Sequence, residues 1–160
     1  DAVSTATPLA WLKMEGVKVG YQELFWGKVG GSLGETSAPA LLLGAAWLLY
    51  RGYIDWRIPA GYLGTVAVLA LALGQDPLFH LLAGGLLLGA FFMATDPVTS
   101  PVTSAGRWVF GAGCGLITMV IRLFGGYPEG VAYSILIMNG FTPLLDRFLH
   151  PVRYGEVRRA

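Results

Sequence analysis

Length, composition and charge limit the classes of protein to which this sequence can belong. The chain has 160 residues, of which 54% are hydrophobic and 13% are charged, and its formal net charge is +1. Soluble domains carry about 25% charged residues. The composition therefore excludes a disordered tail, a nucleic-acid-binding domain with a basic face and an ordinary water-soluble enzyme. With one cysteine, Cys114, and two histidines in distant segments, we expect no metal site. The chain begins at Asp1 without a leader, and we expect it to be a fragment of a longer polypeptide.

Long uncharged segments alternate with short charged ones along the chain. The uncharged segments are residues 36–50, 58–75, 77–95, 108–121 and 131–145. A membrane-spanning helix needs about 20 mainly apolar residues, so the second and third segments are long enough. The others reach that length only if Arg122, or Asp146 with Arg147, lies at a helix end where long side chains extend to the headgroups. A soluble protein with buried helices is the alternative, but a chain of this length cannot surround so many apolar helices. The sequence predicts an all-α, polytopic membrane bundle of about five transmembrane helices.

The positions of the arginines predict how these helices are oriented. If the first helix enters from outside, the inner loops and tail hold Arg51, Arg57, Arg107, Arg153, Arg158 and Arg159. Because positive residues are enriched on the cytoplasmic side of membrane proteins, the C-terminus is predicted to be cytoplasmic. The predicted organisation is an extracytoplasmic segment over residues 1–34, a membrane domain over 35–150 and a cytoplasmic tail over 151–160.

Glycines, prolines and polar side chains interrupt the apolar segments. Glycines such as Gly84 and Gly111 favour close packing of membrane helices. A broken helix that lines a site is the alternative. Residues 97–104, rich in hydroxyl groups and proline, predict a turn on the inner side, with a re-entrant hairpin as the alternative. For His80 and Asn139, hydrogen bonds between helices are favoured over ion coordination.

Several short motifs, taken in their order along the chain, resemble one family. They are DAVSTATPL at 1–9, GSLGETS at 31–37, FMATDPVTSP at 92–101, and YPEG at 127–130 followed by Met138 and Asn139. Together they resemble the membrane subunits of the RnfD/NqrB family, and the Rnf branch more closely than the sodium-translocating quinone reductase branch. The resemblance covers essentially the whole chain, as the C-terminal half of a subunit with about ten membrane helices. It implies that this chain is one five-helix half of a urea-transporter-like inverted repeat.

The resemblance also implies a covalent flavin. Ser4, Thr5, Ala6 and Thr7 match the family's attachment motif, and its last position, Thr7, would carry FMN through a phosphoester to the side-chain oxygen. Thr5 stands where glycine is more familiar, so it remains a minor alternative acceptor. A separate flavin transferase outside the cytoplasm would make the attachment. Trp11, Phe25 and Trp26 are interpreted as interfacial aromatic residues, with stacking on the flavin as the alternative. Whether riboflavin is also present in the complete subunit is left open.

The function implied by the resemblance is electron transfer within a larger complex. Rnf complexes move electrons between ferredoxin and NAD, coupled to sodium or proton movement, in the bacterial or archaeal cytoplasmic membrane. Because this chain holds neither a nucleotide-binding fingerprint nor a cysteine cluster, those activities would belong to other membrane and iron–sulfur subunits, and we expect no catalysis by this chain alone. The alternatives are a urea- or ammonium-type channel or transporter half without redox function, and a structural membrane anchor.

Four polar residues are candidates for an ion path or for the surroundings of a flavin. They are Glu35, Asp96, Glu129 and Asn139. Glu35 and Glu129 each precede a short apolar segment at its outer end, where a carboxylate also stabilises a helix N-terminus. The structural explanation is favoured for these two acids. In the functional alternative, one or both lie beside the flavin or a cation route.

Overall fold

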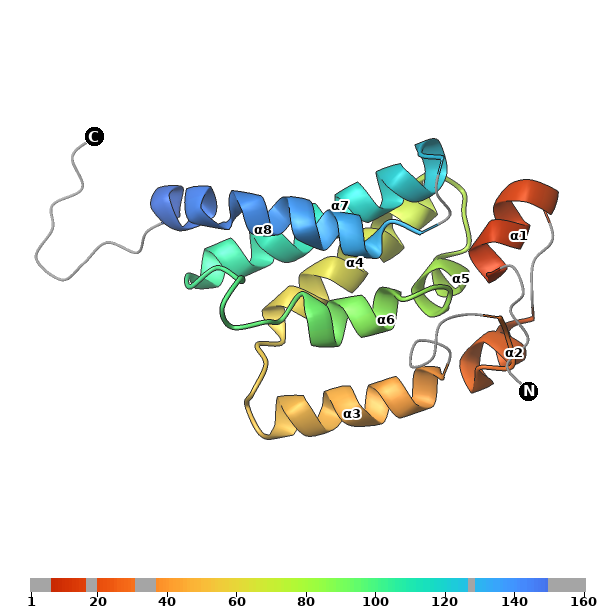
Figure 1. The fold of residues 1–160 in the computed structure, drawn as a ribbon, viewed down its shortest axis with the longest axis horizontal. Coiled ribbons are helices and arrows are strands. Elements are labelled where there is room, and N and C mark those ends of the chain that lie inside the picture. Colours follow the sequence, from red (N-terminus) through yellow and green to blue (C-terminus); the bar gives the residue numbers. More distant parts are fainter. Residues whose placement is uncertain (1–6, 17–19, 31–36, 127–128, 150–160) are drawn as a thin grey trace, which may run out of the picture.

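The computed structural model describes residues 7–16, 20–30, 37–126 and 129–149, and all regular elements in these ranges are helical (Figure 1). The elements are α1 (Pro8–Glu15), α2 (Tyr21–Trp26), α3 (Ala38–Tyr50), α4 (Arg57–Ala72), α5 (Pro77–Leu82), α6 (Leu86–Leu88), a π-helical turn η1 (Gly89–Met93), α7 (Ser104–Phe124) and α8 (Val131–Phe148). Ser4, Thr5, Ala6 and Glu35 lie outside the described residues. The all-α prediction is confirmed for the part of the chain that the structure describes.

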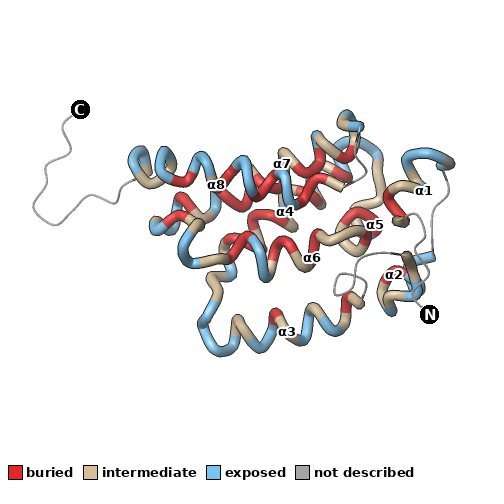
Figure 2. Tube along the Cα trace, viewed as in Figure 1, coloured by how far each residue is buried: buried red, intermediate tan, exposed pale blue. Residues whose placement is uncertain are grey.

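Helices α4, α7 and α8 form the core of the bundle. The buried residues of α4 include Ile58, Tyr62, Val66 and Ala70, which lie four positions apart on one face of the helix. Glycines on α7 allow α4 to approach closely, since a Cβ atom at Gly111 would lie 2.5 Å from the carbonyl oxygen of Ile58. Figure 2 shows the buried positions of these helices facing one another, whereas α3 has few buried residues. The predicted role of α7 glycines in helix packing is therefore confirmed.

The third apolar segment is broken, which corrects the prediction of a continuous helix over 77–95. Helix α5 ends at Leu82, the chain turns through Gly84 with φ +68°, and α6 then begins at Leu86. Only glycine adopts this left-handed conformation without strain. The guanidinium of Arg122 donates hydrogen bonds to the carbonyl oxygens of His80 (2.7 Å) and Ala83 (3.1 Å). Arg122 thus satisfies carbonyl groups that the end of α5 leaves without helical partners.

The long helices differ from the uncharged segments in their bounds. Helix α7 begins at Ser104 after the N-cap Thr103, whose Oγ1 accepts the N–H of Gly106 at 3.0 Å. Of the described helices, α7 alone is both long and apolar enough to cross a membrane, while α3 and α4 are shorter apolar helices. The count of five transmembrane helices therefore remains a prediction. Arg122 does lie in the last turn of α7, but it is buried at 4% exposure instead of extending to the headgroups.

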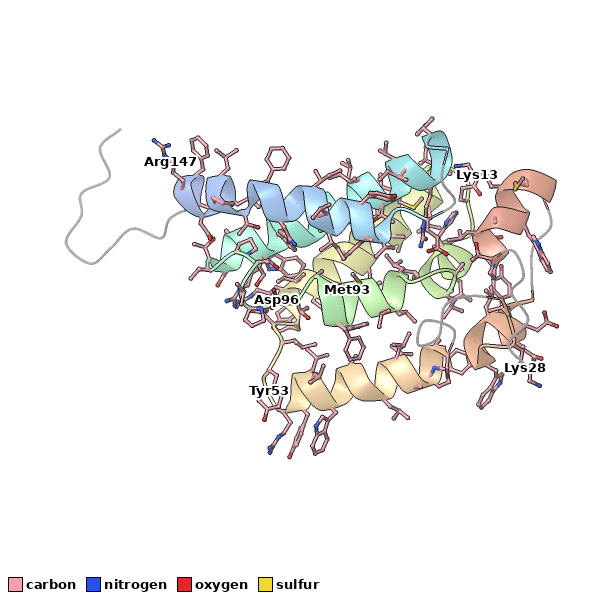
Figure 3. The ribbon with its side chains drawn as sticks, viewed as in Figure 1. Lys13, Lys28, Tyr53, Met93, Asp96 and Arg147 are labelled. Carbon is pink, nitrogen blue, oxygen red and sulfur yellow. The ribbon has the colours of Figure 1, made fainter. Side chains whose placement is uncertain are left out.

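Opposite ends of the bundle carry different groups of residues. One end holds the α3–α4 connection and the connection before α7, and the other holds α1, α2 and α5 (Figure 1). Figure 3 shows Arg147 and Asp96 toward the first end and Lys13 and Lys28 at the second. We call the first the arginine end, because it holds Arg51 after α3, Arg57 at the start of α4 and Arg107 near the start of α7. Which end faces the cytoplasm remains a prediction.

The hydroxyl-rich connection before α7 lies at the arginine end. The backbone N–H of Val102 donates to Asp146 Oδ1 at 3.0 Å, and Thr142 Oγ1 donates to the carbonyl oxygen of Thr99 at 2.9 Å. Val98 and Val102 are exposed. This arrangement is the predicted turn, tied to the last turns of α8.

Candidate functional site

Thr7 is the first described residue of the chain and the N-cap of α1. Its backbone is extended, with φ −67° and ψ 154°, and its Oγ1 accepts the N–H of Ala10 at 3.3 Å. Pro8 follows at the first helical position, where its missing N–H costs no helical hydrogen bond. This Thr-Pro sequence therefore starts the helix. It also places the Thr7 hydroxyl at the positive end of the α1 dipole, a favourable position for a negatively charged group.

Two contacts hold α1 against the bundle at the end opposite the arginines. Leu9 is buried in a small core with Leu24, Phe79 and Ala83. On the next turn of α1, Lys13 Nζ donates to the carbonyl oxygens of Arg122 (3.1 Å) and Gly125 at the end of α7. A cation at these carbonyls also complements the negative end of the α7 dipole. Thr7 is thus attached to the bundle by apolar and polar contacts of its own helix.

Arg122 and Glu129 lie together at the helix break near Gly84, beside Leu9 of α1. Besides its bonds to the α5 carbonyls, the buried Arg122 has a favourable electrostatic interaction with the carboxylate of Glu129. The side chain of Glu129 also approaches the helix break, with Cγ 3.7 Å from the position that a Cβ on Gly84 would occupy. Glu129 precedes the N-cap Gly130 and so lies outside the first turn of α8, and its predicted role at the helix start remains a prediction. The structure adds a second role that the sequence did not indicate, because a buried guanidinium needs a compensating charge.

A cavity of about 580 Å³ lies near the arginine end, between the end of α3, η1 and α8. Two of the predicted candidates, Asp96 and Asn139, line it together with the aromatic side chains of Tyr53, Phe91 and Phe92. Asp96 accepts a hydrogen bond from Thr99 Oγ1 at 3.1 Å. Asn139 Oδ1 is buried and has no hydrogen-bond partner among the described residues. The predicted hydrogen bond between helices is therefore not made by this oxygen to any residue that the structure describes.

The predicted ion-path candidates therefore separate into two places. Asp96 and Asn139 share the cavity near the arginine end. Glu129 lies beside Arg122, toward the end of the bundle that carries α1. Glu35 falls outside the described residues, so the structure does not place it. No single site combines these candidates with Thr7 in the described part of the chain.

A buried network of hydroxyl groups was missed by the sequence analysis. Tyr62 Oη on α4 lies 2.6 Å from Thr118 Oγ1 on α7 and 2.8 Å from Ser134 Oγ on α8. Thr118 donates to Ser134 at 2.8 Å, and Ser134 donates to the carbonyl oxygen of Val131 at 2.7 Å. All three side chains are fully buried. Polar residues within the apolar segments were the available signal, but the sequence does not indicate which of them meet.

A second polar cluster joins the α3–α4 connection to α7. Asp55 pairs with Arg107, and with Arg57 at 3.3 Å, while its Oδ1 accepts the backbone N–H of Arg57 at 2.9 Å. Arg107 Nε also donates to the carbonyl oxygen of Pro101 at 3.0 Å. Partial burial raises the pKa of the Asp55 carboxyl, but the hydrogen bonds and the positive charges together lower it by more. The pKa therefore lies below its ordinary value of 3.8. Asp55 is therefore ionised at neutral pH.

Comparisons with known proteins identify similar sequences over nearly the whole chain. A family model described as the NQR2, RnfD, RnfE family matches residues 1–155. The D subunit of the Na(+)-translocating ferredoxin:NAD(+) oxidoreductase complex of Acetobacterium woodii is 55% identical and is aligned over 99% of this chain and 51% of its own. The D subunit of the proton-translocating ferredoxin:NAD(+) oxidoreductase complex of Clostridium ljungdahlii is 49% identical and is aligned over 99% of this chain and 53% of its own. The D subunit of the ion-translocating oxidoreductase complex of Stutzerimonas stutzeri is 52% identical and is aligned over 84% of this chain and 40% of its own. The chain thus spans about half the length, or less, of these curated relatives.

Proposed function

The chain belongs to the NQR2, RnfD, RnfE family, and from this membership we propose that it is part of the RnfD-type membrane subunit of an Rnf ferredoxin:NAD(+) oxidoreductase complex. The names and identities of the relatives support this proposal. As part of such a subunit, the chain would carry electrons within the membrane and contribute to coupling them to sodium or proton movement. Its partners would be the other membrane and iron–sulfur subunits and the lipid bilayer. The apolar helices and the family together make it a membrane protein.

We propose further that Thr7 carries FMN through a phosphoester. The position of the Thr7 hydroxyl is the observation that supports this: it lies at the N-terminus of α1, where the helix dipole favours the negative charge of a phosphate. The chemistry of the residue fits the group, because a threonine hydroxyl supplies the single oxygen that the ester needs. When attached, FMN would supply the redox chemistry, which this chain's own side chains cannot perform. The contacts of Leu9 and Lys13 would fix the attachment point against the bundle.

The cavity beside Asp96 and Asn139 is our proposal for a second polar site of the complete subunit, either the place of riboflavin or part of the ion route. Its size of about 580 Å³ and its aromatic walls suit a flat ring, and the buried Asn139 Oδ1 needs a donor that no described residue provides. A ring N–H or a hydrated cation would supply that partner. Asp96 adds a negative charge on the same wall.

Replacement of Thr7 tests the flavin proposal. Thr7→Val keeps the β-branched shape and removes the oxygen, so the full-length subunit should insert but lose the fluorescent flavin band on a denaturing gel. Because the hydroxyl also caps α1, Thr7→Asn is the sharper variant: asparagine is a good N-cap but cannot form the ester. It should fold as the wild type does and still lose the band. Thr5→Val is the matched control and should keep it.

Two outcomes would contradict this assignment. A Thr7→Asn subunit that remains fluorescent after denaturation would place the attachment elsewhere, with Thr5 as the next candidate. A wild-type subunit without flavin, from cells that possess the transferase, would favour the channel or transporter alternative. The break between α5 and α6 is the observation that supports that alternative, because interrupted membrane helices often form transport sites.

A further inference from the structure

A second pocket at the arginine end has no role in the proposed function. It measures about 470 Å³ and lies between the α3–α4 connection and the residues that follow η1. Asp55, Arg57 and Arg107 line it, together with Thr95 and Ser100. The pocket thus holds two arginines and one carboxylate. Even with Asp55 ionised, the second arginine leaves the pocket with a net positive charge.

Both arginines keep donors that face no protein acceptor in the described part of the chain. Arg57 uses Nη1 for Asp55 and Ser104, which leaves its Nε and Nη2. Arg107 uses Nε for Pro101 and Nη1 for Asp55, which leaves its Nη2. Their side chains are 33% and 31% exposed, so both guanidinium side chains are partly open to solvent. A guanidinium group with donors to spare binds phosphate through parallel hydrogen bonds.

Exposed aromatic side chains surround the pocket. Tyr53 and Trp56 line it and are 63% and 57% exposed. Trp108 packs edge-to-face on Trp56, with ring centroids 5.5 Å apart, and Arg51 lies over the rings of Trp47 and Tyr53. Tryptophan and tyrosine concentrate where a membrane protein meets the lipid headgroups. These aromatic side chains therefore favour a position of this end at the depth of the headgroups, whichever side of the membrane it faces.

We propose that this pocket binds the phosphate of an anionic phospholipid, such as phosphatidylglycerol. Arg57 and Arg107 bind the phosphate, Ser100 and Thr95 line the space for the polar headgroup, and the acyl chains lie along the exposed apolar surface of α3. Basic pockets between transmembrane helices commonly bind anionic headgroups. The aromatic surroundings favour a lipid over a free anion, and the volume of about 470 Å³ favours a headgroup over the broad surface of an acidic protein.

The test uses the full-length subunit within its complex, reconstituted in nanodiscs of phosphatidylcholine alone or mixed equally with phosphatidylglycerol. Native mass spectrometry counts the lipids that remain bound after detergent extraction, and thermal unfolding reports stability. We expect the wild type to retain phosphatidylglycerol selectively and to be more stable with it. Arg57→Gln should lower this retention about five-fold, the factor expected for one basic residue near an anionic surface. Arg57→Lys should restore part of it, because the charge returns without the planar fork.

Arg147→Gln is the matched control, because Arg147 is exposed on α8 and does not line the pocket. It should leave lipid retention unchanged. In phosphatidylcholine alone, Arg57→Gln should remain folded and lose only the small stability of its partly exposed pair with Asp55, so that lost retention cannot reflect a lost fold. The flavin band should persist in all these variants, which separates this proposal from the assignment of Thr7.

Four results would overturn the proposal. Equal retention of both lipids by the wild type, or an equal effect of Arg57→Gln and Arg147→Gln, would mean that the pocket is not a lipid site. Complete displacement of the lipid by inorganic phosphate at moderate concentration would reduce it to a site for small anions. Loss of partner subunits from Arg57→Gln with unchanged lipid retention would instead identify a protein interface.

Discussion

At the scale of single residues, the hydroxyl network joins the three helices of the core. Tyr62, Thr118 and Ser134 each come from a different helix, and within this network each hydroxyl has a partner at 2.6–2.8 Å. Polar groups in a membrane core have no water to bind, so their partners must come from the protein. The network therefore favours one relative placement of α4, α7 and α8 over others.

Tyr62→Phe measures the contribution of this network to stability. The change removes one buried oxygen at nearly constant volume, and Thr118 and Ser134 still bind each other at 2.8 Å. We expect the free energy of unfolding in detergent to fall by about 1 kcal/mol, the usual order for hydrogen bonds between membrane helices. Tyr50→Phe, at a residue 83% exposed, is the control and should have no effect. Equal stability of Tyr62→Phe and the wild type would show that the network is energetically neutral.

The Asp55 cluster makes stability depend on pH. Because the pKa of Asp55 is lower in the folded chain than in the unfolded one, ionised Asp55 contributes stability above its ordinary pKa of 3.8. That contribution is lost as the pH falls through the lower, folded pKa. The unfolding temperature of the detergent-solubilised protein should therefore not depend on this group near neutral pH. It should fall below about pH 4, as Asp55 becomes protonated. Asp55→Asn should remove this part of the acid dependence. An unchanged dependence of stability on acid pH would show that other groups cause it.

At the scale of helices, the interface between α4 and α7 depends on small residues. A Cβ at Gly111 would lie 2.5 Å from the carbonyl oxygen of Ile58, and one at Gly115 would lie 2.8 Å from that of Tyr62. Backbone atoms cannot move aside as a flexible side chain can. Any larger residue at these positions must therefore separate the two helices.

Gly111→Ala tests this requirement. Overpacking of this kind costs about 1–3 kcal/mol, so the variant should unfold at lower temperature than the wild type. Gly64→Ala on α4 is the matched control, because nothing lies within 4 Å of the new Cβ there. It should be neutral or stabilising by up to about 1 kcal/mol, since alanine favours a helix over glycine. Similar losses for both variants would show that the effect belongs to helical glycines in general and not to the interface.

The sequence predicted the type of the elements better than their continuity. Uncharged apolar segments predict helices because a membrane leaves few other structures for the backbone. The break at Gly84 was not predictable in this way, because the same residue type mediates packing at Gly111. What decides the outcome is Arg122, which reaches from α7 to the carbonyl groups of His80 and Ala83. That contact joins segments distant in the sequence.

The candidate site follows the same pattern. The motif that ends at Thr7 identifies a residue through local sequence, and the Thr-Pro pair also predicts the start of a helix. Asp96 and Asn139 could be named as polar residues in an apolar context, but their common cavity results from how η1 packs beside α8. The role of Arg122 as a buried partner of α5 was missed because a basic residue near a helix end ordinarily extends to the headgroups.

At the scale of the whole molecule, the two ends of the bundle differ in charge and in composition. The arginine end carries the Asp55 cluster, and the opposite end carries α1, α2 and Thr7, whereas exposed tryptophan and tyrosine side chains lie at both ends. The positive-inside rule then predicts that the arginine end is cytoplasmic and Thr7 extracytoplasmic. The flavin proposal depends on this orientation, because the transferase is expected to act outside the cytoplasm.

Cysteine labelling in intact cells tests the orientation directly. The native Cys114 is buried, so it should not react and gives a clean background. Lys28→Cys lies at the end that carries α2 and should react with an impermeant maleimide added outside (Figure 3). Val98→Cys, at a residue 87% exposed near the arginine end, should react only after the membrane is permeabilised, because its side of the membrane is closed to the reagent. Labelling of Val98→Cys but not Lys28→Cys in intact cells would reverse the orientation and would place Thr7 on the side that the transferase cannot reach. Labelling of both variants in intact cells would show that the two ends do not lie on opposite sides of the membrane.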